Sequence, residues 1–142
     1  MESGRYRLTG LAGACAAVLL LVGCSHGGAS HTATVRVTER DFHISAPRQL
    51  SAGVVRLAVH NRGPDDHEFL VIRVSDPRLP LRSDGLTVDE DALEKASLAV
   101  VEPAPPGKTT HLRLHLTPGR YELLCNMAGH YRGGMHALLT VH

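Results

Sequence analysis

The amino-acid sequence predicts an all-β domain, a sandwich of seven to eight short strands with one short inserted helix. After residue 33 the chain contains short runs in which apolar and polar residues alternate, which is the period of a half-buried strand. Clusters of Gly, Pro, Asn and Asp separate these runs. One stretch near residue 90 has helical spacing instead. We expect the strands to pair antiparallel around one compact core.

The first 23 residues predict a signal peptide that precedes the domain. Arg5 and Arg7 lie before an apolar run, residues 8–22, which is short and rich in Ala for a transmembrane helix. The run leads into Leu-Val-Gly-Cys, which resembles the lipobox of bacterial lipoprotein precursors. We therefore expect Cys24 to become the lipidated first residue. An ordinary secretory signal that contains a cysteine is the alternative.

Export and membrane anchoring follow from this interpretation. Residues 24–33 are expected to form the lipidated cysteine and a flexible Gly- and Ser-containing tether, and residues 34–142 the domain. The domain is then extracytoplasmic, held at the outer face of the bacterial cytoplasmic membrane. Where a second membrane exists, the anchor lies on the periplasmic side or in the outer membrane.

The three cysteines leave one free thiol in the mature domain. Cys15 is removed with the signal peptide, and Cys24 carries the lipid. Cys125 then has no internal partner for a disulfide. A lone thiol in an oxidising compartment needs protection or a use, and metal ligation provides both.

The charge balance favours neither nucleic acid nor a membrane surface as a partner. The chain has 15 basic and 14 acidic residues, and removal of Glu2, Arg5 and Arg7 with the signal peptide leaves 13 of each. The sequence contains no run of Lys and Arg and no amphipathic basic helix. We expect no nucleic-acid partner, and contact with the membrane through the lipid anchor.

The first half of the domain contains three predicted strands. Residues 34–37 and 54–60 alternate strictly, so His60 is expected on the outward face. Residues 67–74 are almost continuously apolar, which indicates a central strand that begins at His67.

Residues 75–108 interrupt the strands with several prolines and one predicted helix. Thr87 to Glu90 has the form of a capping box, and Leu93, Ala96 and Val100 recur at helical spacing. We expect this segment to be an insertion that lies on the domain.

The second half contains three more predicted strands. Leucines alternate with polar residues in 111–116, so His111 and His115 are expected to face outward. Residues 120–126 follow a Thr-Pro-Gly turn, and residues 135–141 form a last alternating strand.

A thiolate, an imidazole and a thioether lie on the loop between the last two strands. Cys125, His130 and Met135 are each separated by four residues, a C-x4-H-x4-M arrangement. Thiolate and thioether are soft ligands that select copper, and imidazole binds both of its oxidation states. Zinc is the alternative, but structural zinc sites take four Cys or His ligands, and the Met disfavours them. The loop therefore predicts one copper ion.

His67 is the best candidate for a second histidine ligand. A blue copper site has two nitrogens and one sulfur in a plane and a weak axial Met. His67 follows a turn at the start of the central strand, and the strand pattern does not place it on an outward face.

These motifs resemble the cupredoxin family over residues 35–142. The resemblance rests on His67-Glu68-Phe69, on the Pro118 to Tyr121 turn and on the Cys125 to Met135 loop, whose ligand spacing is similar to the rusticyanin and sulfocyanin type. It implies an eight-stranded Greek-key sandwich. It also implies type 1 copper bound by the ring nitrogens of His67 and His130, by the sulfur of Cys125 and axially by Met135.

Residues beside the ligands differ from the family pattern or are candidates for further roles. Many cupredoxins have Asn or Ser after the first histidine, where it ties the two ligand loops together, but this chain has Glu68. A carboxylate there stabilises Cu(II), is solvated, or pairs with Arg132. Asn126, Met127 and Tyr131 are candidates for supporting the site or for contact with a partner, and packing within the loop is the other interpretation of Met127 and Tyr131.

We interpret the chain as a monomeric carrier of single electrons between redox proteins. Four protein ligands leave no open position for a small-molecule substrate, so we expect no enzymatic activity. His130, among small and soft loop residues, is the expected electron port. Extracytoplasmic copper binding, buffering or delivery is the alternative, and a metal-free structural module is a third possibility.

Overall fold

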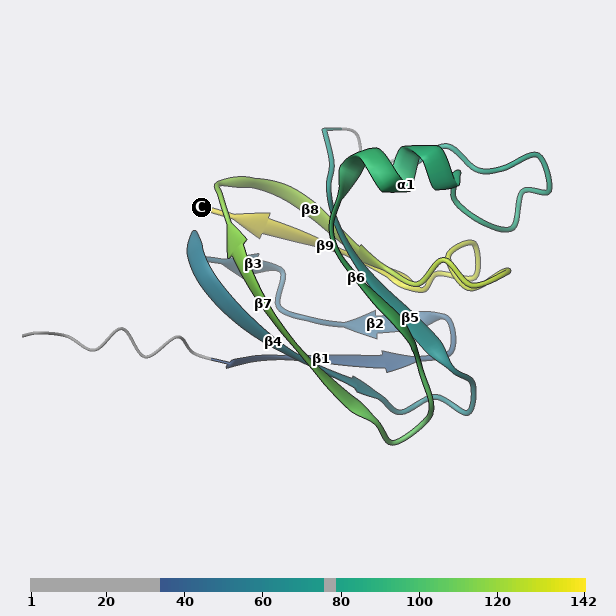
Figure 1. Ribbon diagram of the computed structural model, residues 1–142, viewed down its shortest axis with the longest axis horizontal. Helices are drawn as coiled ribbons and strands as arrows, with labels where there is room; N and C mark the ends of the chain where they lie inside the picture. The colour runs from purple at the N-terminus through teal and green to yellow at the C-terminus, as the bar shows by residue number, and fades with distance from the viewer. Residues whose placement is uncertain (1–33, 76–78) are drawn as a thin grey trace, which may run out of the picture. The chain divides into compact units, whose positions relative to one another are not determined.

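The computed structural model describes residues 34–75 and 79–142 as two β-sheets packed face to face with one short helix (Figure 1). The predicted signal peptide, Cys24 and the tether lie outside the described residues. The elements are β1 (Thr34–Arg40), β2 (His43–Ser45), β3 (Gln49–Leu50), β4 (Gly53–Asn61), β5 (His67–Arg73), α1 (Glu90–Ala96), β6 (Ser97–Ala104), β7 (Thr109–Leu116), β8 (Gly119–Leu124) and β9 (His136–Val141).

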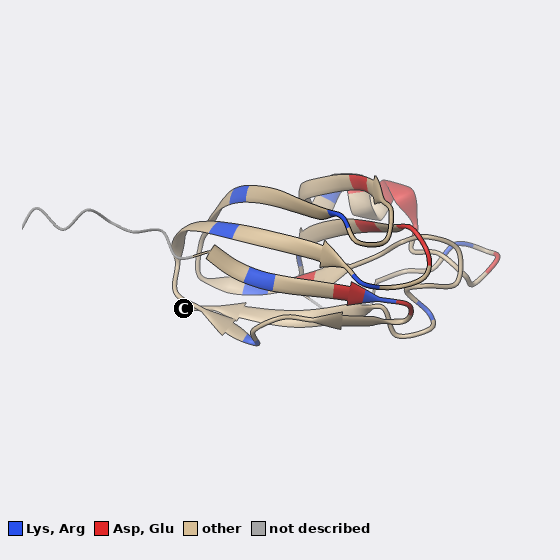
Figure 2. Ribbon diagram, turned by 90° about the horizontal axis from the view of Figure 1, so that it is seen from below, with Lys and Arg blue, Asp and Glu red and all other residues tan. Residues whose placement is uncertain are grey.

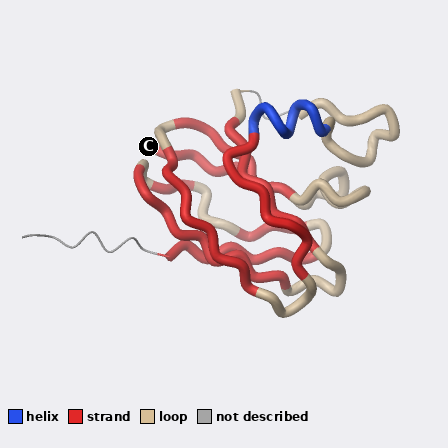
Figure 3. The backbone as a smooth tube through the Cα atoms, in the orientation of Figure 1, coloured by secondary structure: helices blue, strands red, loops and turns tan. Residues whose placement is uncertain are grey.

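The predicted all-β sandwich with one inserted helix is confirmed, but it has more strands than expected. The described residues form nine strands, because β2, β3 and β6 were not predicted. Sheet A has the order β2-β1-β4-β7, and sheet B has the order β3-β9-β8-β5-β6. Strands make up most of the described chain, and the helix lies beside them (Figure 3). The expectation of purely antiparallel pairing is wrong, because β1 pairs parallel with β4, and β3 pairs parallel with β9.

The main core lies between the two sheets and contains the alternate residues that the sequence placed inward. Tyr121, Leu123 and Cys125 share the inner face of sheet B and are buried, as are Leu139 and Val141 on the neighbouring strand. The outward positions predicted for His111 and His115 are also confirmed, since both are exposed. Cys125 directly follows β8, so its side chain is part of the same core as the inward residues of that strand.

A second, smaller core lies on the outer side of sheet B, under the inserted segment. Leu93 of α1 packs with Leu70, Ile72 and Leu124, which confirms that the insertion lies on the domain. In the described part of the chain, no helix is long and apolar enough to cross a bilayer.

Two details of the predicted insertion are wrong. The Asp89 side chain caps the helix by accepting a hydrogen bond from the amide of Ala92, so Thr87 is not the capping residue. Val100 lies in β6 and is exposed, because the chain leaves the helix at Ser97 and pairs with β5. The helical spacing of Val100 with Leu93 was coincidental.

Candidate metal centre

His67, Cys125 and His130 come together at one end of the sandwich. The potential ligand atoms of these three residues all lie within 4.8 Å of one another. His67 begins β5, whereas Cys125 and His130 lie in the loop that joins β8 to β9. All three are buried, and the ring centroids of the two histidines are 5.1 Å apart. The start of one strand and one loop therefore bring together two imidazoles and a thiol.

The loop folds back on itself and brings Met135 to the same place. Cys125 Sγ lies 3.5 Å from His130 Nδ1. The amide of Cys125 donates to the carbonyl of Met135, and the amide of Met135 donates to the carbonyl of His130. Met135 is completely buried in the same core cluster as Cys125. The backbone thus ties the three loop residues to one another.

Burial favours the uncharged forms of Cys125 and His67 when no metal is present. Burial raises the pKa of the Cys125 thiol to about 11, and the carboxylates of Glu68 and Glu39 add to this effect. Burial and the neighbouring His130 lower the pKa of His67. A metal ion is the counter-charge that makes a buried thiolate favourable, because coordination deprotonates the sulfur.

The polar groups of the site fit a bound metal ion. Both ring nitrogens of His67 are buried without a hydrogen-bond partner, which is costly unless another group binds them. Two imidazoles, a thiolate and a thioether form the donor set of a type 1 copper site, and the thioether makes zinc a poor fit. Copper is the metal that these residues fit.

Glu68 ties together the two segments that carry the ligands. Its Oε1 accepts a hydrogen bond of 2.7 Å from the amide of Asn126, the residue after Cys125. Burial raises the pKa of Glu68. The expected alternative partner, Arg132, instead donates to the carbonyl of Gly85. Glu68 thus makes the connection that the family resemblance assigns to Asn or Ser.

The other three candidate residues support the loop in different ways. The side chain of Asn126 exchanges hydrogen bonds with the backbone of Val88, which joins the ligand loop to the inserted segment. Met127 is half-buried against the main core. The Tyr131 hydroxyl donates to the buried carboxylate of Glu122, in a contact of 3.3 Å. Packing therefore accounts for Tyr131, and Met127 combines packing with partial exposure.

The turn between β1 and β2 supplies two residues that the sequence did not single out. Asp41 Oδ1 lies 3.1 Å from His67 Nε2, which is within ion-pair distance. Gly63 makes the approach possible, because a Cβ there would overlap both atoms. Carboxylates in this position fix the tautomer of a metal-binding histidine.

Phe42, the second of these residues, covers His130 at the surface. Its ring stands edge-on to the imidazole with centroids 5.5 Å apart, and it is 52% exposed. Its backbone is left-handed, with φ 61°. A Cβ at Gly133 would overlap the ring. One signal for this role is present in the sequence, because Phe42 is one of only two phenylalanines and lies in an otherwise polar stretch.

Comparison with known proteins gives similarity in structure rather than in sequence. No family model and no curated protein match the sequence. The structure is similar to auracyanin B, with 26% identity and TM-score 0.57 over 77% of this chain and 88% of that one. It is also similar to auracyanin A, a "blue" copper protein from Chloroflexus aurantiacus, with 17% identity and TM-score 0.58 over 78% of this chain and 98% of that one.

Rusticyanin from Thiobacillus ferrooxidans is also similar, with 19% identity and TM-score 0.55 over 77% of this chain and 77% of that one. The chain therefore has the cupredoxin fold, and the end of its sandwich carries the donor set of a type 1 copper site.

Replacement of Gly63 by Ala should weaken copper binding. The added methyl group displaces His67 and Asp41, and we expect a loss of about 10- to 100-fold in Cu(II) affinity, measured by competition with a chelator. Gly107→Ala is the control, because a Cβ at Gly107 meets no other atom, unlike one at Gly63. The φ of +85° at Gly107 makes the substitution strain the backbone. The control should lose stability and keep its affinity. Equal losses of affinity in both variants would contradict the role of Gly63.

Replacement of Glu39 by Gln should remove a dependence of stability on pH. Burial raises the pKa of Glu39 to about 8 from 4.5. The folded protein therefore holds a proton that the unfolded chain has lost, so this contribution to stability is full below pH 4.5 and is lost as pH rises through 8. At about pH 9 we expect the free energy of unfolding of the metal-free variant to exceed that of the wild type by roughly 3–5 kcal/mol, as measured by denaturant unfolding. Glu94→Gln, an exposed control, should follow the wild type. Parallel curves for Glu39→Gln and the wild type would exclude a buried neutral carboxyl.

Proposed function

We propose that this protein is an exported, lipid-anchored carrier of single electrons that holds one copper ion. The ion supplies a Cu(I)/Cu(II) couple when bound. His67, Cys125 and His130 would hold it, together with the neighbouring thioether of Met135. The observation that carries the proposal is the gathering of three buried ligand groups within 4.8 Å of one another. Two of them, Cys125 and His130, lie on a loop whose backbone hydrogen bonds also hold Met135.

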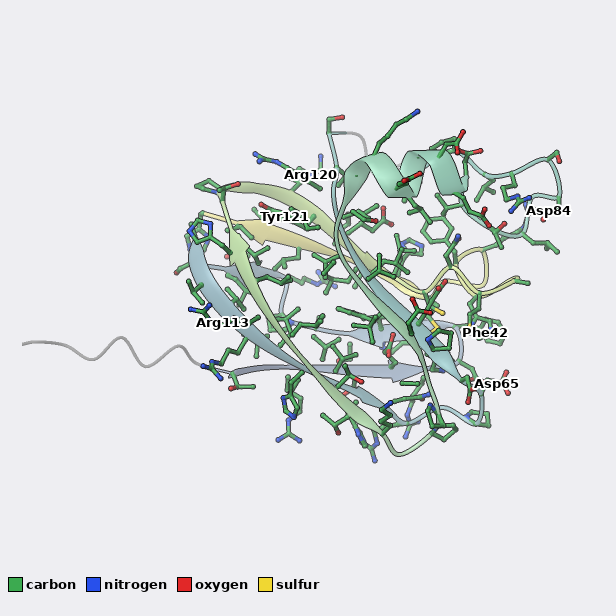
Figure 4. All side chains as sticks on the ribbon, viewed as in Figure 1. Phe42, Asp65, Asp84, Arg113, Arg120 and Tyr121 are labelled. Atoms are coloured by element: carbon green, nitrogen blue, oxygen red, sulfur yellow. The ribbon has the colours of Figure 1, made fainter. Side chains whose placement is uncertain are left out.

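The surroundings of His130 support an electron path to the surface. His130 is 8% exposed, whereas His67, Cys125 and Met135 are completely or almost completely buried. Phe42 extends the path, because its ring touches the imidazole and is half exposed. Phe42 and Asp65 lie at the same end of the sandwich in Figure 4. A partner that contacts Phe42 comes within one aromatic ring of a ligand.

The rigidity of the ligand segments favours electron transfer. The hydrogen bonds of Cys125, Met135 and Glu68 hold the ligands in place through backbone and side-chain contacts. When ligands keep their positions, a change in oxidation state requires little rearrangement. A site of this kind supports exchange of an electron and offers no open position to a substrate, so we propose no catalytic activity.

Burial of the ligands disfavours copper delivery as the main role. Copper chaperones exchange their ion through accessible ligands, but Cys125 and Met135 are 0% exposed and His67 is 1% exposed. Release of the ion requires the loop or the turn that carries Asp41 and Phe42 to open. We therefore place electron transfer before copper handling.

The visible spectrum tests this function. Residues 25–142, loaded with one equivalent of Cu(II), should show an intense thiolate-to-copper band that disappears on reduction and returns on reoxidation. Cys125→Ser should abolish the band, because the band requires the thiolate. Cys24→Ser in the full-length chain is the matched control, which should keep the band and lose lipid labelling.

Two results would overturn the proposal in separate ways. Copper held only as Cu(I), without a reversible band and with rapid transfer to chelators, would indicate copper handling. Absence of lipid on the wild-type chain in a bacterial host would remove the anchor and leave the copper function standing.

A further inference from the structure

The outer face of sheet A carries many cationic side chains and no outward-facing carboxylate. Alternate residues of its four strands point away from the core, and the acidic residue of these strands, Glu39, points inward and is buried. We call this surface the basic face. Its charged and titratable members are Arg36, Arg40, His43, Arg56, His60, His111, Arg113 and His115.

The arginines of the basic face lie side by side without neutralising partners. Arg56 and Arg113 are directly opposite each other on β4 and β7. Like charges in this arrangement destabilise a sheet, and none of the ion pairs found among the described residues involves them. In Figure 2, Lys and Arg form blue bands on neighbouring strands, and most red segments lie towards the other end. Repulsion between the two guanidinium groups destabilises the sheet, and an anion bound from outside would offset it.

We propose that the basic face is a docking surface for a bilayer that contains anionic lipids. This inference rests on the lipid anchor in the proposed function. Thr34, where the domain begins, is on the basic face and is paired with Arg56. Nine residues separate it from Cys24, and such a segment spans at most about 35 Å. The anchor therefore holds this face close to lipid headgroups.

Docking through the part of the basic face that carries Arg56 and Arg113 leaves the copper end free. Arg40 and His43 flank the turn with Phe42 and lie at the copper end. Arg113 and Phe42 lie at opposite ends of the sandwich in Figure 4. A domain that lies on its basic face places the Phe42 end to the side, where a redox partner has access to His130. The surface is also built of extended strands, and a hollow on it is lined by Arg36, His60 and His111 among others.

A second basic cluster on the other sheet provides a rival surface. Arg73, Lys95 and Arg120 line a hollow beside α1. Arg73 is already engaged, because its guanidinium donates to Thr117 and to the carbonyl of Pro118. Lys95 and Arg120 are exposed. Their replacement by Gln changes the net charge by the same amount as replacement of two arginines of the basic face.

Vesicle co-sedimentation of residues 25–142 tests the proposal without the lipid. These residues contain the whole compact unit His31–His142 with both cores. The copper-loaded protein should bind vesicles of phosphatidylcholine with phosphatidylglycerol and should not bind pure phosphatidylcholine. Arg56→Gln with Arg113→Gln should weaken binding about 25-fold, because each arginine near an anionic bilayer contributes about fivefold. Lys95→Gln with Arg120→Gln should change binding less than twofold.

The same variants distinguish the possible failures. The Arg56 and Arg113 double variant should be at least as stable as the wild type and keep its spectrum, so weaker binding does not reflect misfolding. Equal losses in both double variants, or equal binding to both kinds of vesicle, would overturn the assignment. Binding of a DNA oligonucleotide as tight as binding of anionic vesicles would also overturn it and indicate a general polyanion surface. None of these outcomes changes the visible band, which tests the copper function separately.

Discussion

The hydrogen bond from the Asn126 amide to Glu68 Oε1 joins the two segments that supply the metal ligands. These segments are 58 residues apart in the sequence. Antiparallel pairing of β5 and β8 brings them together, but the ladder ends at Leu70 and Leu124. If its register continued, Glu68 would stand opposite Asn126. The carboxylate therefore replaces the missing backbone bonds of the ladder at the place where the strands separate around the site.

Other contacts of the site depend on this connection. The Glu68 bond fixes the loop at Asn126. The Asn126 side chain then holds Val88 and the inserted segment, and the loop backbone positions the turn that contains His130 and Met135. The turn with Asp41 and Phe42 then closes the remaining side over both histidines. The ligands are therefore supported from three directions.

The sequence predicted the ligand group because its signals are local. The spacing of Cys125, His130 and Met135 fits one loop, and strand alternation placed Cys125 on the core face. His67 could be selected because the turn before it and the apolar strand after it mark a strand start. These patterns depend only on residues that are neighbours in the chain, so they can be found without knowledge of how distant strands pair.

Features that arise from pairing of distant segments were missed. Strand β6 contains Pro103 and the exposed Leu98 and Val100, so it lacked a clean period of two, and only its ladder with β5 makes it a strand. Asp41 reaches His67 because Gly63 leaves space, which no local pattern reveals. The basic face was hidden for the same reason, since its arginines are scattered through three strands and meet only when β1, β4 and β7 pair.

The central claim is that the fold holds one set of copper ligands in both oxidation states. X-ray absorption of the copper-loaded protein, recorded before and after chemical reduction, tests this claim most directly. We expect two nitrogens and one short sulfur around copper in both spectra, with little change in their distances. Loss of a nitrogen or of the sulfur on reduction, or a zinc-like shell of four equal ligands, would contradict the claim.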